Sequence, residues 1–397
     1  MTEWIKCTIG DLCDTISDTY NGNDENVILV NTSDVLEGRV LNHIQVPNKN
    51  LKGQFKKKFR KNDILFSEIR PANKRFAFID FENTSNYIAS TKLMVLRHNE
   101  KVLPAYLYAI LKSNYILAEL QHLAETRSGT FPQITFTSEL APMKVNLPDK
   151  KTQKQIVSIL SSIEETIDVN KSINKNLEQQ AQAIFKAWFI DFEPFDEKIP
   201  ANWVVSKLGE IASIKTSSFS PVKNPDAQLE HYSIPAYDEQ KYPVFESAEG
   251  VKSNKYILSK NSVMISKLNP NTKRAWRPMC LSGLAVSSTE FIIFEAFNPA
   301  YKDFVFSIID STAFSDWMCA HTTGSTNSRQ RTTPSATLEF QVALPDEKTI
   351  TDFCAIVTPM YDTISANICE NQELAQLRDS ILPKLMSGEL DVSNLNL

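Results

Sequence analysis

Apolar side chains recur at alternating steps of four and three residues along a stretch in the middle of the chain. They are Ile156, Leu160, Ile163 and Ile167, and then Leu177, Ala181, Ile184 and Trp188. This spacing is typical of the seam of a coiled coil. It predicts one helix from about Lys150 to Phe189, which at about 1.5 Å per residue is roughly 60 Å long. Such a length suits a spacer that holds two other parts of a protein apart.

Asn170 and Asn174 interrupt this seam, and the end of the chain repeats the whole pattern 197 residues later. The repeated positions are Phe353, Val357, Met360, Ile364, Asn367, Asn371, Leu374, Arg378, Ile381 and Leu385. A buried amide needs a hydrogen-bond partner and thereby fixes the alignment of two helices. We therefore expect two helices packed antiparallel, with Asn170, Asn174, Asn367 and Asn371 setting their register. Two separate amphipathic helices, each on its own domain, are the alternative.

The ends of both predicted helices carry recognisable signals. Asp149 and Asp346 each follow a proline and stand where an N-cap belongs. Gly388 is typical of a helix stop. Pro359 lies inside the second pattern, so we expect that helix to start late or to bend there. Arg378 occupies the seam position that matches Ala181, which indicates that the helix pair is not fully symmetric.

The segments before the two helices alternate short β-patterned runs with turn signals and helical patterns. In residues 1–146 these are Val27–Val30, Ile64–Phe66, Phe76–Ile79 and Lys92–Leu96, with a helical pattern at Pro104–Ala124. In residues 203–343 they are Val263–Ser266 and Phe291–Phe294, with a helical pattern at Pro299–Ala320. The patterns predict an α+β module in duplicate. Asp191–Asn202, with two prolines, is predicted to be the connection into the second copy.

Short sequence matches support the duplication, because they keep one order and nearly one offset. Leu147-Pro148-Asp149 recurs as Leu344-Pro345-Asp346, 197 residues later. Asn62 to Pro71 matches Asn261 to Pro270 at an offset of 199, and Ser90-Thr91-Lys92-Leu93 matches Ser288-Thr289-Glu290-Phe291 at an offset of 198. We infer a tandem duplication of one globular module followed by one helix.

The composition fits a globular protein of two to three domains, with 397 residues of which 42% are hydrophobic and 22% charged. No stretch has the roughly 20 apolar residues of a membrane span, and the N-terminus lacks a signal-peptide core. We therefore expect a cytoplasmic protein. The six cysteines form no CxxC pair and the five histidines have no ligand spacing, which predicts free thiols and no metal site.

A net charge of −5 argues mildly against nucleic-acid binding, but the basic residues gather in specific places. In the first module they are Lys56, Lys57, Lys58, Arg60 and Lys61, followed by Arg70, Lys74 and Arg75. In the second they are Lys267, Lys273, Arg274, Arg277 and Arg331. A polar loop with Arg127, Thr130 and Gln133 matches one with Thr326, Arg329 and Gln330. One such run is typical of a solvated face, whereas its recurrence in both halves favours contacts with phosphates and base edges.

Motifs that carry chemistry are absent from the sequence. It contains no P-loop and no glycine-rich dinucleotide fingerprint, and no catalytic triad or carboxylate pair stands out. Asn269-Pro270-Asn271-Thr272 differs from the Asn-Pro-Pro-aromatic motif of amino-methyltransferases. We therefore expect a chain that recognises a partner without catalysing a reaction.

Three segments together resemble the specificity (S) subunits of type I restriction–modification systems. The stretch from Leu147-Pro148-Asp149 to Trp188-Phe189 and on to Pro194-Phe195 resembles the central conserved region of that family. Ile199-Pro200-Ala201-Asn202-Trp203 resembles the entry to its second recognition domain, and Leu374-Ala375 through Leu382-Pro383-Lys384 to Leu390 resembles its C-terminal conserved region. The resemblance extends over the whole chain.

The resemblance implies an α+β chain with two tandem pseudo-repeated α/β target recognition domains joined by two long antiparallel coiled-coil helices. The domains are residues 1–147 and 196–344, and the helical spacers are residues 148–195 and 345–397. Each domain would read half of a split site in double-stranded DNA. The implied partners are two methyltransferase subunits and nuclease–translocase subunits, in a complex with restriction endonuclease and adenine methyltransferase activity. S-adenosylmethionine, ATP and Mg²⁺ would be bound by those partners, with no cofactor in this chain.

Two alternatives to this interpretation remain open. One is a self-contained enzyme, such as a methyltransferase fused to a recognition domain, and the missing motifs count against it. The other is a protein scaffold that does not bind DNA, in which the basic run Lys56–Lys61 is incidental.

Overall fold

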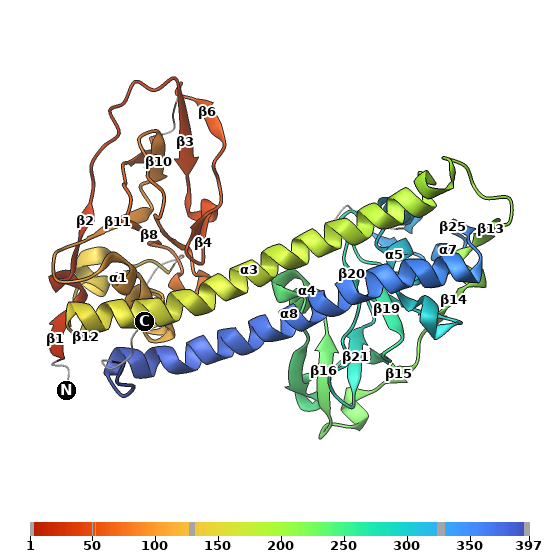
Figure 1. The fold of residues 1–397 in the computed structure, drawn as a ribbon. Coiled ribbons are helices and arrows are strands. Elements are labelled where there is room, and N and C mark those ends of the chain that lie inside the picture. The colour runs from red at the N-terminus through yellow and green to blue at the C-terminus, as the bar shows by residue number, and fades with distance from the viewer. Residues whose placement is uncertain (1–3, 50, 52, 127–131, 324–329, 393–397) are drawn as a thin grey trace. The chain divides into compact units, whose positions relative to one another are not determined.

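The computed structural model describes residues 4–49, 51, 53–126, 132–323 and 330–392. The chain divides into two compact units, of which the first contains Met1–Glu165 and Leu374–Leu397 and the second Thr166–Glu373. Each unit combines one α+β module with a part of both long helices, α3 (Lys150–Phe189) and α8 (Glu347–Ser387) (Figure 1).

Two four-stranded sheets form the framework of the first module. Their strands are β2 (Cys13–Ile16), β3 (Asn26–Val30), β6 (Gln45–Pro47), β7 (Phe55–Lys57), β8 (Ile64–Ser67), β9 (Phe76–Phe78), β10 (Tyr87–Ser90) and β11 (Leu93–His98). One sheet has the order β2-β11-β8-β9, and the other has the order β6-β3-β10-β7 with β3 and β10 parallel. A small hairpin joins β4 (Val35–Leu36) to β5 (Arg39–Val40), and β1 (Ile5–Thr8) pairs with β12 (Lys144–Leu147).

The second module has the same framework. Its strands are β13 (Val204–Lys207), β14 (Ala212–Lys215), β15 (Ser218–Phe219), β16 (Gln228–Tyr232), β17 (Val244–Ser247), β18 (Lys255–Ile257), β19 (Ser262–Ser266), β20 (Ala275–Trp276), β21 (Ala285–Ser288), β22 (Phe291–Ala296), β23 (Thr322–Thr323), β24 (Arg331–Thr332) and β25 (Gln341–Leu344). The sheet β14-β22-β19-β20 corresponds to β2-β11-β8-β9, and β16 and β21 are parallel as β3 and β10 are. The other sheet has the order β17-β16-β21-β18, which corresponds to β6-β3-β10-β7, and adds β15 at its edge. The shared strand order confirms the predicted tandem duplication.

In each module, the segment with a helical sequence pattern folds into two helices and not into one continuous helix. Pro104–Ala124 contains α1 (Pro104–Leu111) and most of α2 (Asn114–Thr126), and Pro299–Ala320 contains α5 (Lys302–Ile309) and α6 (Thr312–Ala320). A serine stands at each break. Ser113 Oγ accepts a hydrogen bond from the Ile116 N–H, and Ser311 Oγ accepts one from the Phe314 N–H, so each hydroxyl caps the helix that follows. Two short helices, α4 (Ile234–Gln240) and α7 (Pro334–Thr337), complete the second module.

The long helices begin at the expected caps. Asp149 Oδ1 accepts the Thr152 N–H at 2.8 Å, and Asp346 Oδ1 accepts the Thr349 N–H at 3.0 Å, which confirms both N-caps. Helix α8 begins at Glu347 and continues through Pro359, so the expected late start is wrong, and the alternative of a bend at Pro359 stays a prediction. Pro359 has no N–H to donate within the helix, but Val357 and Tyr361 on either side of it are buried in the core of the second unit and hold the helix in place.

The two long helices pack antiparallel in each unit. In the first unit, Ile156 and Leu160 of α3 share a core with Leu382 and Leu385 of α8. In the second unit, residues from the end of α3 and from the first half of α8 share a core. They are Ala181 and Phe185 of α3, and Phe353, Val357 and Ile364 of α8. The predicted seam is confirmed, and the alternative of two separate helices is excluded. None of the helices in the described part of the chain is long and apolar enough to cross a membrane.

Candidate nucleic-acid interface

The first candidate surface in each unit is the loop that follows a buried strand, β8 in the first unit and β19 in the second. Ser67 Oγ accepts the Ile69 N–H and donates to the Ile69 carbonyl, and Ser266 makes the same two bonds with Leu268. The residue after this turn, Arg70 or Asn269, has a left-handed backbone with φ of 47° or 51°. The two loops therefore have the same conformation although their side chains differ.

Three cations of the first module are free to meet a ligand. Lys56, Arg60 and Arg70 are exposed, and none of them forms an ion pair with another described residue. Lys58 lies 6.0 Å from the centre of the Tyr20 ring, at the limit of a cation–π contact. An unpaired exposed cation can neutralise a phosphate without first breaking an internal ion pair.

The other cations of the first module have internal partners. Lys61 pairs with Glu82 at 2.6 Å, Lys74 pairs with Glu37 at 3.3 Å, and Arg75 donates to the Ser33 and Val35 carbonyls. Lys57 donates from Nζ to the Leu93 carbonyl at 2.8 Å, and its burial lowers the pKa of the ammonium group. Lys57 thus contacts the protein itself.

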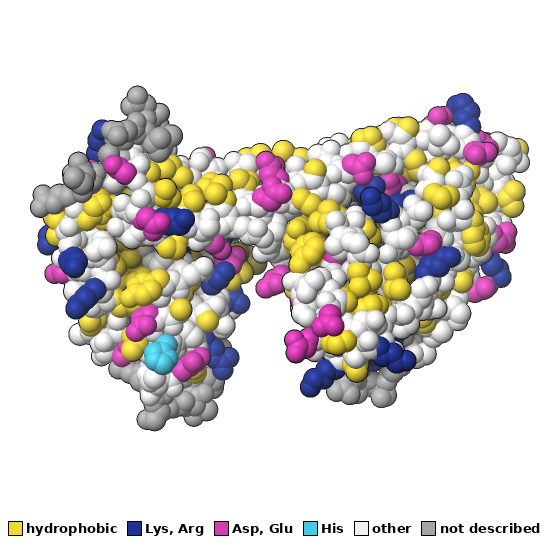
Figure 2. All heavy atoms as spheres, turned by 90° about the horizontal axis from the view of Figure 1, so that it is seen from below, with side chains coloured by type: hydrophobic (Ala, Val, Ile, Leu, Met, Phe, Trp, Pro, Cys, Tyr) yellow, Lys and Arg dark blue, Asp and Glu magenta, His cyan; other side chains and the backbone are white. Residues whose placement is uncertain are grey.

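In the second module most of the predicted cations are paired. Arg274 makes two bonds to the Asp238 carboxylate, Arg331 makes two bonds to the Glu290 carboxylate, and Lys273 pairs with Asp310 at 2.9 Å. Lys267 forms no ion pair with another described residue. On the face of the molecule that Figure 2 shows, Lys and Arg side chains are accordingly interspersed with Asp and Glu.

Arg277 is half-buried and bonded to two carboxylates. It donates to Asp303 at 2.7 Å and to Asp362 at 2.8 Å, and so connects α5 to α8. Burial opposes the charged form, but the two carboxylates outweigh it and raise the pKa of the guanidinium. This geometry fits a bracing role inside the second unit.

The two predicted polar loops are only partly within the described residues. Arg127, Thr130, Thr326 and Arg329 lie outside them. Gln133 forms a β-bridge with Ile69, and the Gln330 carbonyl accepts the Asn269 N–H at 2.9 Å. The described end of each polar loop therefore lies against the loop after β8 or β19. The predicted match of Gln133 with Gln330 is wrong by one residue, because the Arg70 N–H donates to the Pro132 carbonyl as the Asn269 N–H donates to that of Gln330, and Gln133 corresponds to Arg331.

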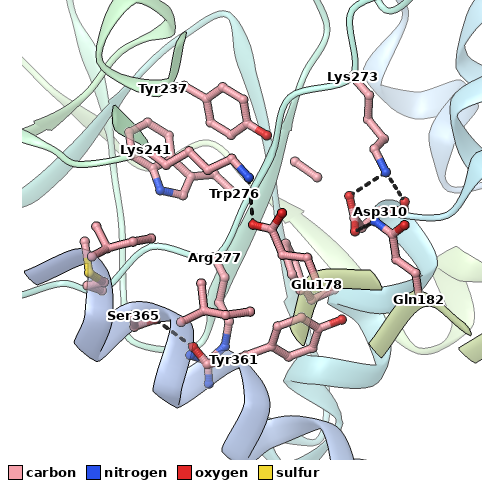
Figure 3. Close-up of a pocket in the computed structure, with 15 residues that line it drawn as sticks. Glu178, Gln182, Tyr237, Lys241, Lys273, Trp276, Arg277, Asp310, Tyr361 and Ser365 are labelled. Atoms are coloured by element: carbon pink, nitrogen blue, oxygen red, sulfur yellow. Dashed lines mark hydrogen bonds and ion pairs between the residues drawn. The ribbon is translucent and has the colours of Figure 1, made fainter. Parts of the chain in front are cut away.

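A cleft of about 120 Å³ lies in the second unit, lined by residues of α3, α4, α8 and β20 (Figure 3). Its ion pairs join Lys241 to Glu178 at 2.7 Å and Lys273 to Asp310. The charged groups are thus neutralised within the wall, as the dashed lines in Figure 3 show. Among the described residues, no three His, Cys, Asp or Glu side chains are grouped so that they could hold a metal ion.

The four seam asparagines meet in two pairs across the helix pair of the second unit. Asn170 Nδ2 donates to Asn371 Oδ1 at 3.0 Å and to Glu370 Oε2 at 2.8 Å. Asn367 Nδ2 donates to Asn174 Oδ1 at 2.8 Å. The amides therefore satisfy each other where the seam has no apolar side chain.

One flank of α3 in the second unit carries no charge. On α3 and directly after it, the positions one residue before the seam are Thr166, Val169, Ile173, Asn176, Gln180, Ala183, Ala187 and Ile190. On α8 the equivalent positions are Ile356, Pro359, Thr363 and Ala366, which are exposed, together with the acidic Asp352, Glu370 and Glu373. Val169 is 56% exposed and Ile173 39%. Equivalent flanks of two antiparallel helices lie on the same side of the pair, so the second unit has an exposed, partly apolar face, which is uncharged on α3 and carries acidic residues on α8.

Sequence reasoning missed the acidic members of the loop surface. Glu68 lies 3.7 Å from Lys92, and Glu290 binds Arg331. The aligned repeats already contained the signal, because Glu68 stands opposite Lys267 and Lys92 stands opposite Glu290. A search for basic runs alone does not detect positions at which one repeat has an acidic residue and the other has a basic one.

Comparisons with known proteins agree with the geometry. Residues 1–179 match a family model described as the type I restriction modification DNA specificity domain. The chain is 29% identical to the specificity subunit of the type I restriction enzyme HindI from Haemophilus influenzae, over 98% of this chain and 100% of that protein. It is 25% identical to the specificity subunit of the type I restriction enzyme MjaIX from Methanocaldococcus jannaschii, over 74% of this chain and 71% of that protein.

The fold is similar to that of a solved structure. The crystal structure of a type I restriction–modification system S subunit from M. genitalium superposes with a TM-score of 0.59 at 16% identity, with 97% of this chain and 96% of that chain covered. At this identity the likeness concerns the fold alone.

Proposed function

The chain belongs to the specificity subunits of type I restriction–modification systems, and from this premise we propose that it reads a bipartite DNA site, one half with each repeated module. The observation that carries the proposal is the repetition of one loop conformation, after β8 and after β19, on two frameworks of equal strand order. Two equivalent surfaces on one chain suit a site made of two half-sites. The chain then contributes recognition, and the chemistry belongs to its partners.

We assign residues 1–147 and 196–344 to the target recognition domains. Within them, we assign phosphate contacts to three cations of the first module that form no ion pair with another described residue, namely Lys56, Arg60 and Arg70. We assign the contacts with base edges to the polar loops, whose described ends at Gln133 and Gln330 lie against the loops after β8 and β19. The cations that are already paired, such as Arg274 and Arg277, hold the second domain together.

We assign the helical spacers, residues 148–195 and 345–397, to the spacing between the two half-sites. Removing one heptad from each helix shortens a coiled coil by about 10 Å without changing which residues face the seam. Such a variant is expected to change the length of the unspecified gap and to leave both half-sites intact. A change in the half-sites themselves would contradict the proposal that the helices set only the distance between them.

The partners in this proposal are two methyltransferase subunits, with nuclease–translocase subunits in the larger complex and S-adenosylmethionine, ATP and Mg²⁺ bound by those partners. The uncharged flank of α3 in the second unit supports docking there. Val169 and Ile173 are exposed apolar side chains one helical turn apart, on the flank without charges. An apolar helical stripe of this kind fits the apolar face of a partner helix.

The experiment that tests the function is co-expression with the methyltransferase subunit encoded beside this chain, followed by genome-wide mapping of methylated adenines. We expect two short specified runs separated by a fixed unspecified gap. A stable complex that methylates no split motif would overturn the proposal and favour a scaffold.

A further inference from the structure

Three positions on the loop surface are equivalent in the two modules by their backbone hydrogen bonds. The Glu68 N–H donates to the Lys92 carbonyl at 3.1 Å, and the Lys267 N–H donates to the Glu290 carbonyl at 2.9 Å. The Glu68 carbonyl accepts the Ile134 N–H at 2.9 Å, and the Lys267 carbonyl accepts the Thr332 N–H at 3.0 Å. The bridge from Ile69 to Gln133 corresponds to that from Leu268 to Arg331.

Two of these three positions have exchanged their charges, and the third changes from neutral to positive. Glu68, Lys92 and Gln133 in the first module correspond to Lys267, Glu290 and Arg331 in the second. The acidic residue of each module is paired, because Glu68 lies 3.7 Å from Lys92 and Glu290 makes two bonds to Arg331, whereas Lys267 forms no ion pair with another described residue. One backbone therefore presents an acceptor at a given point in one module and a donor at the same point in the other.

We infer that this exchanged trio determines which base each module accepts, an inference that rests on the proposed function. A carboxylate at Glu68 accepts hydrogen bonds and so suits the amino group of cytosine or adenine in the major groove. An ammonium group at Lys267 donates and so suits the oxygen and nitrogen acceptors of guanine. The two half-sites would then differ at the position that this loop contacts.

Two further observations place the trio at a ligand-facing surface. Glu68 and Lys92 are 22% and 49% exposed at their side chains, and Glu290 and Arg331 are 28% and 44% exposed, so all four can reach a ligand. Arg70, two residues after Glu68, is exposed and has no ion pair among the described residues. The partly exposed carboxylate of Glu68 could then contact a base while the nearby guanidinium of Arg70 contacts a phosphate.

The test is a reciprocal graft in the complex with the methyltransferase subunit. Glu68→Lys with Lys92→Glu and Gln133→Arg gives the first module the trio of the second, and Lys267→Glu with Glu290→Lys and Arg331→Gln does the reverse. We expect each graft to change one or two bases in one half-site only. Methylation at the original site should fall about tenfold or more, as for the loss of a good base contact. The gap and the other half-site should stay the same.

A matched control is Lys207→Glu with Glu339→Lys, which reverses an exposed ion pair of the second unit away from the trio and should leave the motif unchanged. Where a graft does not fold, Glu68→Gln keeps the shape and removes the charge, and it should relax the same base. An unaltered motif in the folded grafts, or in Glu68→Gln, overturns the inference while a split motif from the wild type keeps the proposed function. A wild type that gives no split motif overturns both.

Discussion

Asn367 donates a hydrogen bond of 2.8 Å from Nδ2 to Oδ1 of Asn174, between two helices whose sequences are related by duplication. Asn174 is 8% exposed, so each amide depends on the other. Replacing either one with Ala should lower the free energy of unfolding by about 1–3 kcal/mol, because a buried polar group loses its partner. Urea denaturation of both single variants and the double variant measures the coupling, which we expect to be about 0.5–3 kcal/mol.

Asn176 is the control for this pair, since it lies on the same helix and is exposed. Asn176→Ala should change the free energy of unfolding by less than about 0.5 kcal/mol. Strictly additive effects of the two seam variants would show that the amides do not act as a pair.

Gly388 ends α8 with a left-handed backbone, φ 79°, and the Leu390 N–H closes the turn on the Lys384 carbonyl at 3.1 Å. A Cβ at this position would lie 2.7 Å from the Trp4 ring. Gly388→Ala should therefore lower the free energy of unfolding by about 1–2 kcal/mol from the backbone alone, with the ring contact adding to it. Gly250→Ala, where a Cβ meets nothing within 4 Å, is the matched substitution and should be near neutral in the same thermal melts.

Periodicity and capping made the helix pair predictable from sequence, because these signals lie within a few residues of each other. The positions of Ile156 and Phe353 in the seam, and of Asp149 at the cap, required no knowledge of the fold. The breaks at Ser113 and Ser311 were not predictable in this way, since the apolar pattern continues through them. Only the capping bonds of their hydroxyl groups show where one helix ends and the next begins.

The candidate surface was less predictable, because ion pairing depends on contacts between distant residues. Arg331 binds Glu290, 41 residues away, and Arg277 binds Asp362, 85 residues away. Basic residues in the sequence therefore include both free cations and neutralised ones. Only the fold shows that Arg277 is paired, whereas Arg70 has no ion pair with another described residue.

Arg277 should matter for stability rather than for DNA affinity. Its removal leaves Asp303, which is 3% exposed, without its main countercharge, although the Thr358 hydroxyl still donates to it. Arg277→Ala is expected to cost about 3–5 kcal/mol in the free energy of unfolding, as for other broken buried pairs. Lys348→Ala removes an exposed pair with Asp352 and should cost less than about 0.5 kcal/mol. A stable Arg277→Ala variant with weakened DNA binding would instead place Arg277 at the DNA.

Unpaired and paired cations should differ in their effect on the salt dependence of DNA binding. Each phosphate contact contributes about 0.9 to the slope of log K against log salt concentration. Arg70→Ala in the assembled complex should therefore reduce the slope by about 1, whereas Lys207→Ala, whose ammonium pairs with Glu339, should leave it unchanged. Fluorescence anisotropy with a labelled duplex at several salt concentrations measures both slopes, and equal slopes for Arg70→Ala and the wild type would remove Arg70 from the contact set.

The two flanks of α3 should differ in their importance for assembly. Ile173 lies on the uncharged flank, where a carboxylate would have to be buried against an apolar partner helix, and burying an unpaired charge is strongly unfavourable. Ile173→Glu should weaken binding of the methyltransferase subunit at least about tenfold in calorimetric titrations, without lowering the melting temperature of the free chain. Lys175→Glu places the same carboxylate two residues away on the charged flank and should leave the affinity nearly unchanged. Equal losses from both variants would mean that the uncharged flank of α3 has no special role in docking, and a loss from Lys175→Glu alone would mean that the partner covers the charged flank.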